Sequence, residues 1–168
     1  MDPLPIFEVP QKVLQAWTVR VGVPETNRLD VWIEPVHLLP SVRALLKARW
    51  GYFSAITGLD QPPTGEGDTA VEGRVEVLYH FCEGPAVLTL RTSGPYSNPR
   101  MGSICGVLPS ATLYERELIE MFGVELDGTT TTERLLLSDD WPVGVYPLRK
   151  SFTGLTEKSE EVQDGSPA

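Results

Sequence analysis

Four charged residues that could do chemistry lie close together in ATLYERELIEMFGVELDG, residues 111–128: Glu115, Arg116, Glu117 and Glu120. Glu117 and Glu120 are three residues apart, so a helix over this segment places both on one face. Two neighbouring carboxylates can perform acid–base catalysis or hold a metal ion, if their surroundings give them different pKa values. This pair is therefore the candidate catalytic site.

The same residues also suit a structural role. Arg116 and Glu120 stand at positions i and i+4, and further basic residues follow downstream. A buried carboxylate is costly unless it is paired, and arginine pairs with it through two parallel hydrogen bonds. We therefore favour a structural clamp, a set of ion pairs that holds the later loops against the helix. Its expected members are Glu115, Arg116, Glu117, Glu120, Arg134, Arg149 and Lys150.

Other reactive or ligand-binding arrangements are missing from the sequence. Cys82 and Cys105 are the only cysteines and form no CxxC pair, so this chain alone cannot assemble a zinc site or an iron–sulfur cluster. His37 and His80 have no metal-ligand spacing, and we expect both to be structural. There is no nucleophile elbow, dinucleotide fingerprint or P-loop. We expect no cofactor, no metal and no catalytic residue on this chain.

The charge of the chain restricts its partners. Lysine and arginine number 14 against 23 acidic residues, a net charge of −9. This balance argues against nucleic acid or an anionic lipid surface as the main partner, and it allows a basic protein surface. The N-terminus does not read as a secretory signal, and no apolar run approaches ~18 residues. We therefore expect contact with a membrane only through other chains.

Periodicity predicts helices and strands in an order that defines the fold class. Helices are expected over about 10–18 and 36–49, and the second should stop at Gly51. A third helix is expected to begin with a Thr112–Glu115 capping box, or with Ser110 as the cap, and to end at Gly123. Strands are expected over 28–35, 52–60, 74–82 and 86–92, the last two as a hairpin; 104–109 is either a short strand or an extended entry to the third helix.

This order does not repeat as β-α-β-α. It predicts a two-layer α+β fold, with helices on one face of a mostly antiparallel or mixed sheet and a long C-terminal extension. Residues 61–73 are expected to form a polar, mobile loop, and the threonine run after Gly128 another loop. We expect a single domain over 1–152 and an acidic, disordered tail over 153–168.

Two motifs carry a family resemblance: LYERELIEMFGVEL, followed after a short gap by RLLLSDDWPVGVYPLRKSF. Together they resemble the 30 kDa subunit family of proton-pumping NADH–quinone oxidoreductase, respiratory complex I, which includes a related subunit of membrane-bound nickel–iron hydrogenases. LLKARWGYFSAITGLD, ending at Asp60, extends the resemblance upstream. The matching site positions are Glu115, Arg116, Glu117, Glu120, Phe122, Gly123, Arg134, Pro147, Leu148, Arg149 and Lys150. Glu120 stands where the family usually has aspartate, and DGTTTTE replaces its usual Gly-His-Pro-Asp-Leu-Arg segment.

The resemblance implies a non-catalytic structural subunit in the cytoplasmic peripheral arm of a complex I-like membrane oxidoreductase. Such a subunit docks on the large subunit (49 kDa-like, or the hydrogenase large subunit) beside iron–sulfur subunits. Iron–sulfur clusters, and flavin or nickel–iron, are then expected in those partners, with the chain peripheral on the cytoplasmic side of the cell membrane. The alternative from the residues alone is a free-standing acid–base enzyme that uses Glu117 and Glu120.

Overall fold

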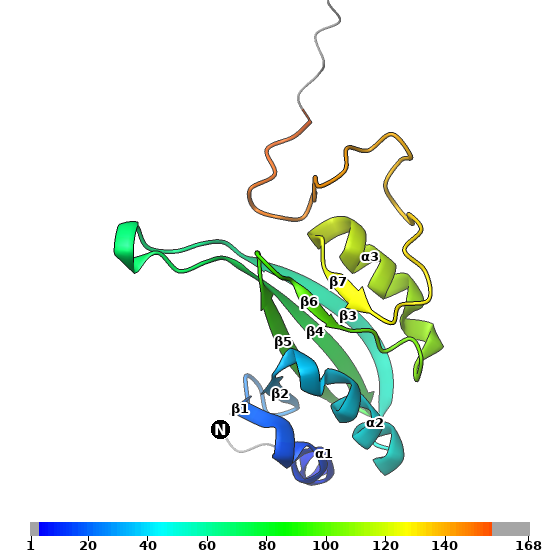
Figure 1. Ribbon diagram of the computed structural model, residues 1–168. Coiled ribbons are helices and arrows are strands. Elements are labelled where there is room, and N and C mark those ends of the chain that lie inside the picture. The colour runs from blue at the N-terminus through cyan, green and yellow to red at the C-terminus, as the bar shows by residue number, and fades with distance from the viewer. Residues whose placement is uncertain (1–3, 156–168) are drawn as a thin grey trace, which may run out of the picture.

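A computed structural model describes residues 4–155, and its centre is a five-stranded sheet (Figure 1). The strands lie in the order β1-β2-β5-β4-β3. Only β2 and β5 run parallel, and the other three neighbouring pairs are antiparallel. The strands are β1 (Thr18–Gly22), β2 (Arg28–Ile33), β3 (Tyr52–Gln61), β4 (Arg74–Glu83) and β5 (Ala86–Pro95). The predicted α+β class, the mixed sheet and the β4–β5 hairpin are confirmed.

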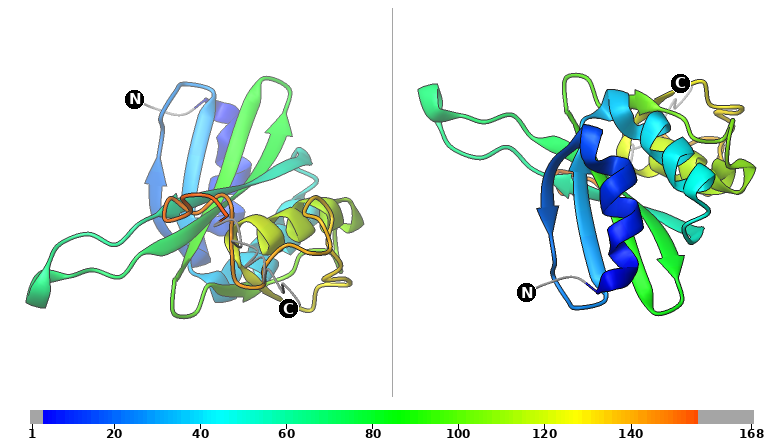
Figure 2. Two further views of the ribbon diagram at one scale, coloured as in Figure 1. Left: turned by 90° about the horizontal axis from the view of Figure 1, so that it is seen from above. Right: turned by 90° about the horizontal axis from the view of Figure 1, so that it is seen from below.

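Within residues 4–155, three α-helices pack over one face of this sheet. They are α1 (Glu8–Leu14), α2 (Leu38–Ala48) and α3 (Thr112–Phe122). Four short 3-10 turns of the described chain adjoin these helices: η1 (Pro5–Phe7), η2 (Gln15–Trp17), η3 (Pro35–His37) and η5 (Pro109–Ala111). A further turn, η4 (Gly67–Thr69), lies between β3 and β4. Figure 2 shows α1 beside α2 over the sheet, while α3 lies against β3. The two-layer arrangement follows from the alternation of buried and exposed residues along the strands.

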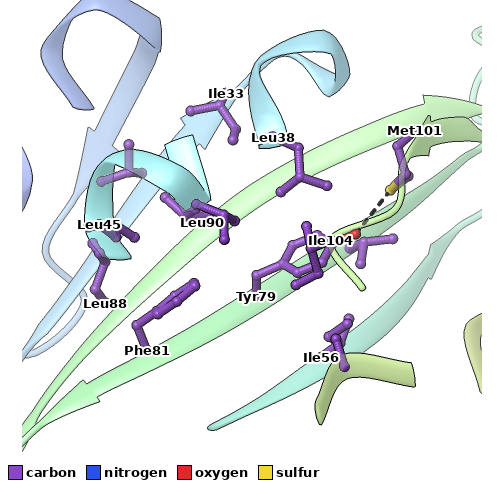
Figure 3. Packing of buried hydrophobic residues seen from close by; sticks show 14 of the residues in the cluster. Ile33, Leu38, Leu45, Ile56, Tyr79, Phe81, Leu88, Leu90, Met101 and Ile104 are labelled. Atoms are coloured by element: carbon purple, nitrogen blue, oxygen red, sulfur yellow. Dashed lines mark hydrogen bonds between the residues drawn. The ribbon is translucent and has the colours of Figure 1, made fainter. Parts of the chain in front are cut away.

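The core lies between the helices and the sheet, and β4 shows why the layers form. Its alternate residues Val75, Val77, Tyr79 and Phe81 are at most 1% exposed. Figure 3 shows the side chains of Tyr79 and Phe81 between α2 and the later loops, with the Tyr79 hydroxyl 3.5 Å from Sδ of Met101. Burial, with the negative charge of Glu115 as a smaller cause, raises the pKa of Tyr79 well above its ordinary value.

The opposite face of the sheet carries polar and charged side chains. Arg91 on β5 binds Asp30 on β2 at 2.8 Å and Glu76 on β4 at 2.9 Å. The guanidinium of Arg91 also lies 4.7 Å from the centre of the Trp32 ring. These contacts link three adjacent strands through one side chain, so this face is stabilised by a charge network instead of apolar packing.

Several predicted boundaries differ from the structure. Helix α2 ends at Ala48, and its C-cap residue is Arg49, which adopts the left-handed conformation with a φ of 52°, instead of Gly51. The segment 104–109 forms turns, neither a strand nor an extended entry. A short parallel pair, β6 (Arg100–Gly102) and β7 (Glu125–Asp127), was not predicted. One strand precedes α3 in the sequence and the other follows it, so the pair joins the segments on either side of that helix.

Residues 61–73 project from the body as a long two-stranded arm, which Figures 1 and 2 show extending beyond the sheet. Thr64 and Val71 form a bridge within the arm, and η4 closes its tip. At its other end the chain leaves β7 and wraps around α3 without regular secondary structure (Figure 1). We call residues 128–155 the C-terminal strap. The tail predicted to be disordered lies, from residue 156 onward, outside the described residues.

Candidate functional site

Helix α3 places the first carboxylate of the cluster, Glu115, in the core, where it is fully buried. One of its oxygens accepts a hydrogen bond from the main-chain N–H of Ile104 at 2.7 Å, and the other accepts from the Ser103 hydroxyl at 2.7 Å. Glu115 also raises the pKa of the neighbouring Cys105 thiol, although burial is the larger cause. This carboxylate therefore fixes the turn that precedes the helix.

The predicted capping box at the start of α3 is wrong. The turn η5 leads directly into the helix, so the N-cap position falls on Ala111, and no side chain caps it. The Thr112 hydroxyl donates instead to the carbonyl of Pro109 at 2.7 Å. Because Glu115 is drawn into the core by donors from the preceding turn, it does not reach back to the helix start. The predicted helix end at Gly123 is confirmed, with a φ of 67°.

Arg116 and Glu120 do not pair with each other; both bind the main chain of the C-terminal strap. Nε of Arg116 donates to the carbonyl of Glu133 at 2.9 Å, and its guanidinium also donates to the carbonyl of Arg134. Glu120, 8% exposed, accepts from the N–H groups of Leu135 and Leu136. The peptide unit between residues 134 and 135 is thus held from both sides, its carbonyl by the arginine and its N–H by the carboxylate.

The ion pairs expected between α3 and the later arginines do not form within residues 4–155. Arg134 turns its guanidinium to carbonyls of its own segment, those of Ser138 and, at 2.7 Å, Trp141. Arg149 donates through Nε to the carbonyl of Phe122 at 2.8 Å, at the end of α3. These two arginines therefore bind carbonyl oxygens instead of the carboxylates that we expected.

The Pro147–Lys150 motif closes the strap over the end of α3. The N–H of Leu148 donates to the carbonyl of Met121 at 3.2 Å, and the N–H of Lys150 donates to Oδ2 of Asp60 at 2.9 Å. Pro147 is half-buried, and the Lys150 side chain forms no ion pair with any described residue. The motif is therefore attached mainly through its main chain.

The acceptor of this motif, Asp60, has a second partner that sequence reasoning missed. The Tyr96 hydroxyl donates to Oδ1 of Asp60 at 2.5 Å, and the Arg149 guanidinium lies 4.7 Å from the centres of both the Tyr96 and Tyr146 rings. Burial, and then the hydrogen bond to Asp60, raise the pKa of Tyr96 to about 12. Tyr96 lies four residues beyond the predicted strand 86–92 and gave no signal for this contact, because the contact depends on how β3, β5 and the strap meet.

Glu117 differs from the other two carboxylates. It is half-buried, and no hydrogen bond or ion pair joins its side chain to any residue in the described part of the chain. It lines a hollow of about 480 Å³ with Phe53, Leu113 and Leu136, and a smaller hollow of about 200 Å³ beside β3. Glu120 lines a different hollow, on the strap side of α3. The two carboxylates of the candidate pair therefore face different surroundings.

The described residues contain no group of three or more histidine, cysteine or acidic side chains placed to hold a metal ion. Nor does any helix within that part of the chain have the length and apolar character needed to cross a bilayer. The fold and site define a small α+β protein whose last helix anchors an irregular C-terminal strap through side-chain to main-chain hydrogen bonds.

Comparison with known proteins identifies the family. Residues 31–158 match the family described as "Respiratory-chain NADH dehydrogenase, 30 Kd subunit", and the chain belongs to this family. The beta subunit of the membrane-bound hydrogenase of Pyrococcus furiosus is 35% identical over 83 residues, 49% of this chain and 48% of that protein. This chain thus matches about half the length of that relative. The C subunit of the NADH-quinone oxidoreductase of Jannaschia sp. is 32% identical over 145 residues, 83% of this chain and 66% of that protein.

Solved structures show the same fold. A chain from the membrane-bound sulfane sulfur reductase, described as an archaeal respiratory membrane complex, aligns with a TM-score of 0.70 and 25% identity. The alignment covers 86% of this chain and 84% of that chain. A trypsin-resistant fragment of Nqo5 aligns with a TM-score of 0.56 over 74% of this chain and 95% of the fragment, and at 15% identity it supports the fold alone.

Proposed function

We propose that this chain is a non-catalytic structural subunit of the peripheral arm of a complex I-like membrane oxidoreductase. It docks on the large subunit, beside iron–sulfur subunits, on the cytoplasmic side of the membrane. Its partners carry the redox groups: iron–sulfur clusters, with flavin or nickel–iron according to the complex. Family membership supports this proposal, as do relatives named as subunits of NADH–quinone oxidoreductase and membrane-bound hydrogenase.

The observation that carries the docking role is the state of the C-terminal strap. Hydrogen bonds tie it to Arg116 and Glu120, to the carbonyls of Met121 and Phe122 at the end of α3, and to Asp60. Yet several of its apolar side chains face outward: Leu136 is 61% exposed, Leu148 51% and Val143 95%. A segment held in a fixed path with exposed apolar side chains is suited to burial against another protein.

The geometry argues against the acid–base enzyme that uses Glu117 and Glu120. Both oxygens of Glu120 already accept hydrogen bonds from main-chain N–H groups of the strap, so this carboxylate is committed to structure. A general base must reach the proton that it abstracts, and two cooperating carboxylates must face one bound substrate. Glu117 and Glu120 instead line separate hollows.

The test is to purify the full chain, tagged, from membranes in mild detergent and to identify the subunits that accompany it. We expect a large subunit and iron–sulfur subunits, with iron and either flavin or nickel in the purified complex. In parallel, deletion of the gene should abolish assembly of that complex. Recovery of the chain alone, or a normally assembled and active oxidoreductase in its absence, would contradict the proposal.

A further inference from the structure

Glu117 lies at the centre of a groove between α3 and β3. Two hollows meet there, because Glu117 and Tyr114 line both of them. The larger hollow reaches Phe53 and the smaller one Gly58, so together they follow about six residues of β3, or roughly 20 Å of extended chain. We call this the α3–β3 groove.

Large apolar side chains, a few hydroxyl side chains and one charged side chain line the groove. Leu113 is 57% exposed and Leu136 61% exposed on one side, while Ile56 and Phe122 close the floor. Among the described residues that line the two hollows, Glu117 is the only one with a charge. Buried further by a partner, that carboxylate would lose hydration without compensation unless the partner supplied a donor.

The strand that borders the groove also has an open edge. β3 is the last strand of the sheet, so alternate main-chain N–H and C=O groups along it are not bonded to β4. The Tyr114 hydroxyl donates to the carbonyl of Ser54, at the irregularity in the β3–β4 register, at 3.1 Å. An extended segment lying along the groove can pair with the remaining groups, as in strand addition to a sheet edge.

We propose that the α3–β3 groove binds an extended segment of a partner subunit, which places one lysine or arginine against Glu117 between two apolar side chains. The negative charge of Glu117 favours a basic partner segment over the acidic C-terminal residues of the chain itself. The chain's own residues 156–168 contain four acids and one lysine, so they would bring negative charge to a negative site. A basic side chain supplies the missing donor for Glu117, and its neighbours cover Leu113 and Leu136. The inference rests on the proposed function, because it assigns part of the docking surface.

The first experiment maps the occupant by photo-crosslinking in the assembled complex. A photoreactive amino acid replaces Leu113 in the tagged full chain, and a second version carries it at Val36, which is 75% exposed on η3, away from the groove. We expect position 113 to crosslink to one partner segment that contains a lysine or arginine flanked by apolar residues. Crosslinks to residues 156–168 of the same chain, or to a segment without a basic residue, would overturn the inference.

The second experiment tests the charge. Glu117→Lys should reduce incorporation of the chain into the complex about tenfold or more, since it places like charges together at the interface. Glu34→Lys, at an exposed acid outside the groove, should have no effect. Glu117→Gln, which cannot perturb folding by charge reversal, should give an intermediate loss. Equal incorporation of all three variants and the wild type would contradict the inference.

These outcomes separate the inference from the function on which it rests. If the wild-type chain co-purifies with its partners but the groove crosslinks to none of them, the inference fails and the structural role stands. If the wild-type chain co-purifies with no other protein, the proposed function itself fails. A partner Lys→Glu or Arg→Glu change at the crosslinked residue should restore incorporation of Glu117→Lys, and failure of that rescue would reject direct pairing.

Discussion

At the scale of single residues, three glutamates on one helix turn out to have three different surroundings. Glu115 is inside the core and serves two donors from the preceding turn. Glu120 serves two N–H groups of the strap, and Glu117 faces an open groove. Three identical side chains within six residues thus have three roles: Glu115 fixes a turn, Glu120 binds the strap, and Glu117 is left in the groove without a partner among the described residues. The spacing of the acids could not distinguish these surroundings, because each depends on segments that fold against different sides of α3.

The buried carboxylate gives the first prediction at this scale. Glu115→Gln keeps the size of the side chain but turns one acceptor oxygen into a donor that faces the Ser103 hydroxyl or the Ile104 N–H. We expect a loss of about 1–3 kcal/mol in the free energy of unfolding. Urea denaturation of the full chain measures it, with the exposed Glu34→Gln as the control. Equal midpoints for the two variants would show that Glu115 does not hold the turn.

At the scale of elements, α3 is the joint between the sheet and the strap. Its Phe122 ring lies against Gly58 of β3, where a Cβ atom would overlap the ring. One residue later the chain turns through Gly123, and Tyr146 of the strap packs so closely on that glycine that a Cβ there would overlap the tyrosine ring. Two glycines therefore allow α3 to contact both its sheet strand and its strap.

A glycine substitution separates backbone strain from steric overlap. Gly123→Ala should destabilise the protein by the ~1–2 kcal/mol of a left-handed alanine plus the overlap with Tyr146. Gly84→Ala is the matched control, because Gly84 has a φ of 56° but no atom within 4 Å of the place where a Cβ would lie. In thermal unfolding, Gly123→Ala should lower the midpoint temperature more than Gly84→Ala does. Adding Tyr146→Ala to each variant should remove this difference between the two glycine substitutions. Equal decreases in the two single variants would mean that the strap does not pack on α3 as described.

Much of this element-scale picture was predictable and part of it was not. Apolar patterns and helix start and stop signals located β2, β3, β4, β5 and the three helices, although the first helix runs from Glu8 to Leu14 instead of 10–18 and β1 begins at Thr18. The pairing of β6 with β7 was missed because strands of three residues carry too little pattern to read. The capping box failed for another reason: a 3-10 turn continued into the helix and moved the cap position. The family motif located the anchoring residues, but their partners are main-chain atoms, which a sequence does not display.

At the scale of the whole molecule, Asp60 ties together segments that are distant in sequence. It accepts from Tyr96 at the end of β5 and from the N–H of Lys150, 90 residues away in the strap. Together with the contact between the Arg149 guanidinium and the Tyr96 ring, it holds the strap against the sheet as well as against α3. This carboxylate therefore connects the strap to the sheet, and its hydrogen bond to a phenol makes that connection sensitive to high pH.

The phenol gives a pH-dependence prediction. The pKa of Tyr96 is raised from 10.0 to about 12 in the folded protein, so the folded state favours the neutral, donating phenol. Its contribution to stability is complete below pH 10 and is lost as the pH rises towards 12. Denaturation midpoints measured across this range should fall more steeply for the wild type than for Tyr96→Phe. Tyr79, whose pKa is also raised, is present in both proteins, so parallel curves would contradict the role assigned to Tyr96.

The hydrogen bonds from Arg116 and Glu120 to the main chain of the strap have a consequence for how the sequence can evolve. Both side chains bind carbonyl and N–H groups of residues 133–136, which every amino acid except proline provides. Selection on this anchor therefore acts on α3 and leaves the strap residues free to diverge, as long as proline is avoided at 135 and 136. A lineage can rewrite the threonine-rich stretch to suit a new neighbour while the chain keeps the same route over the helix.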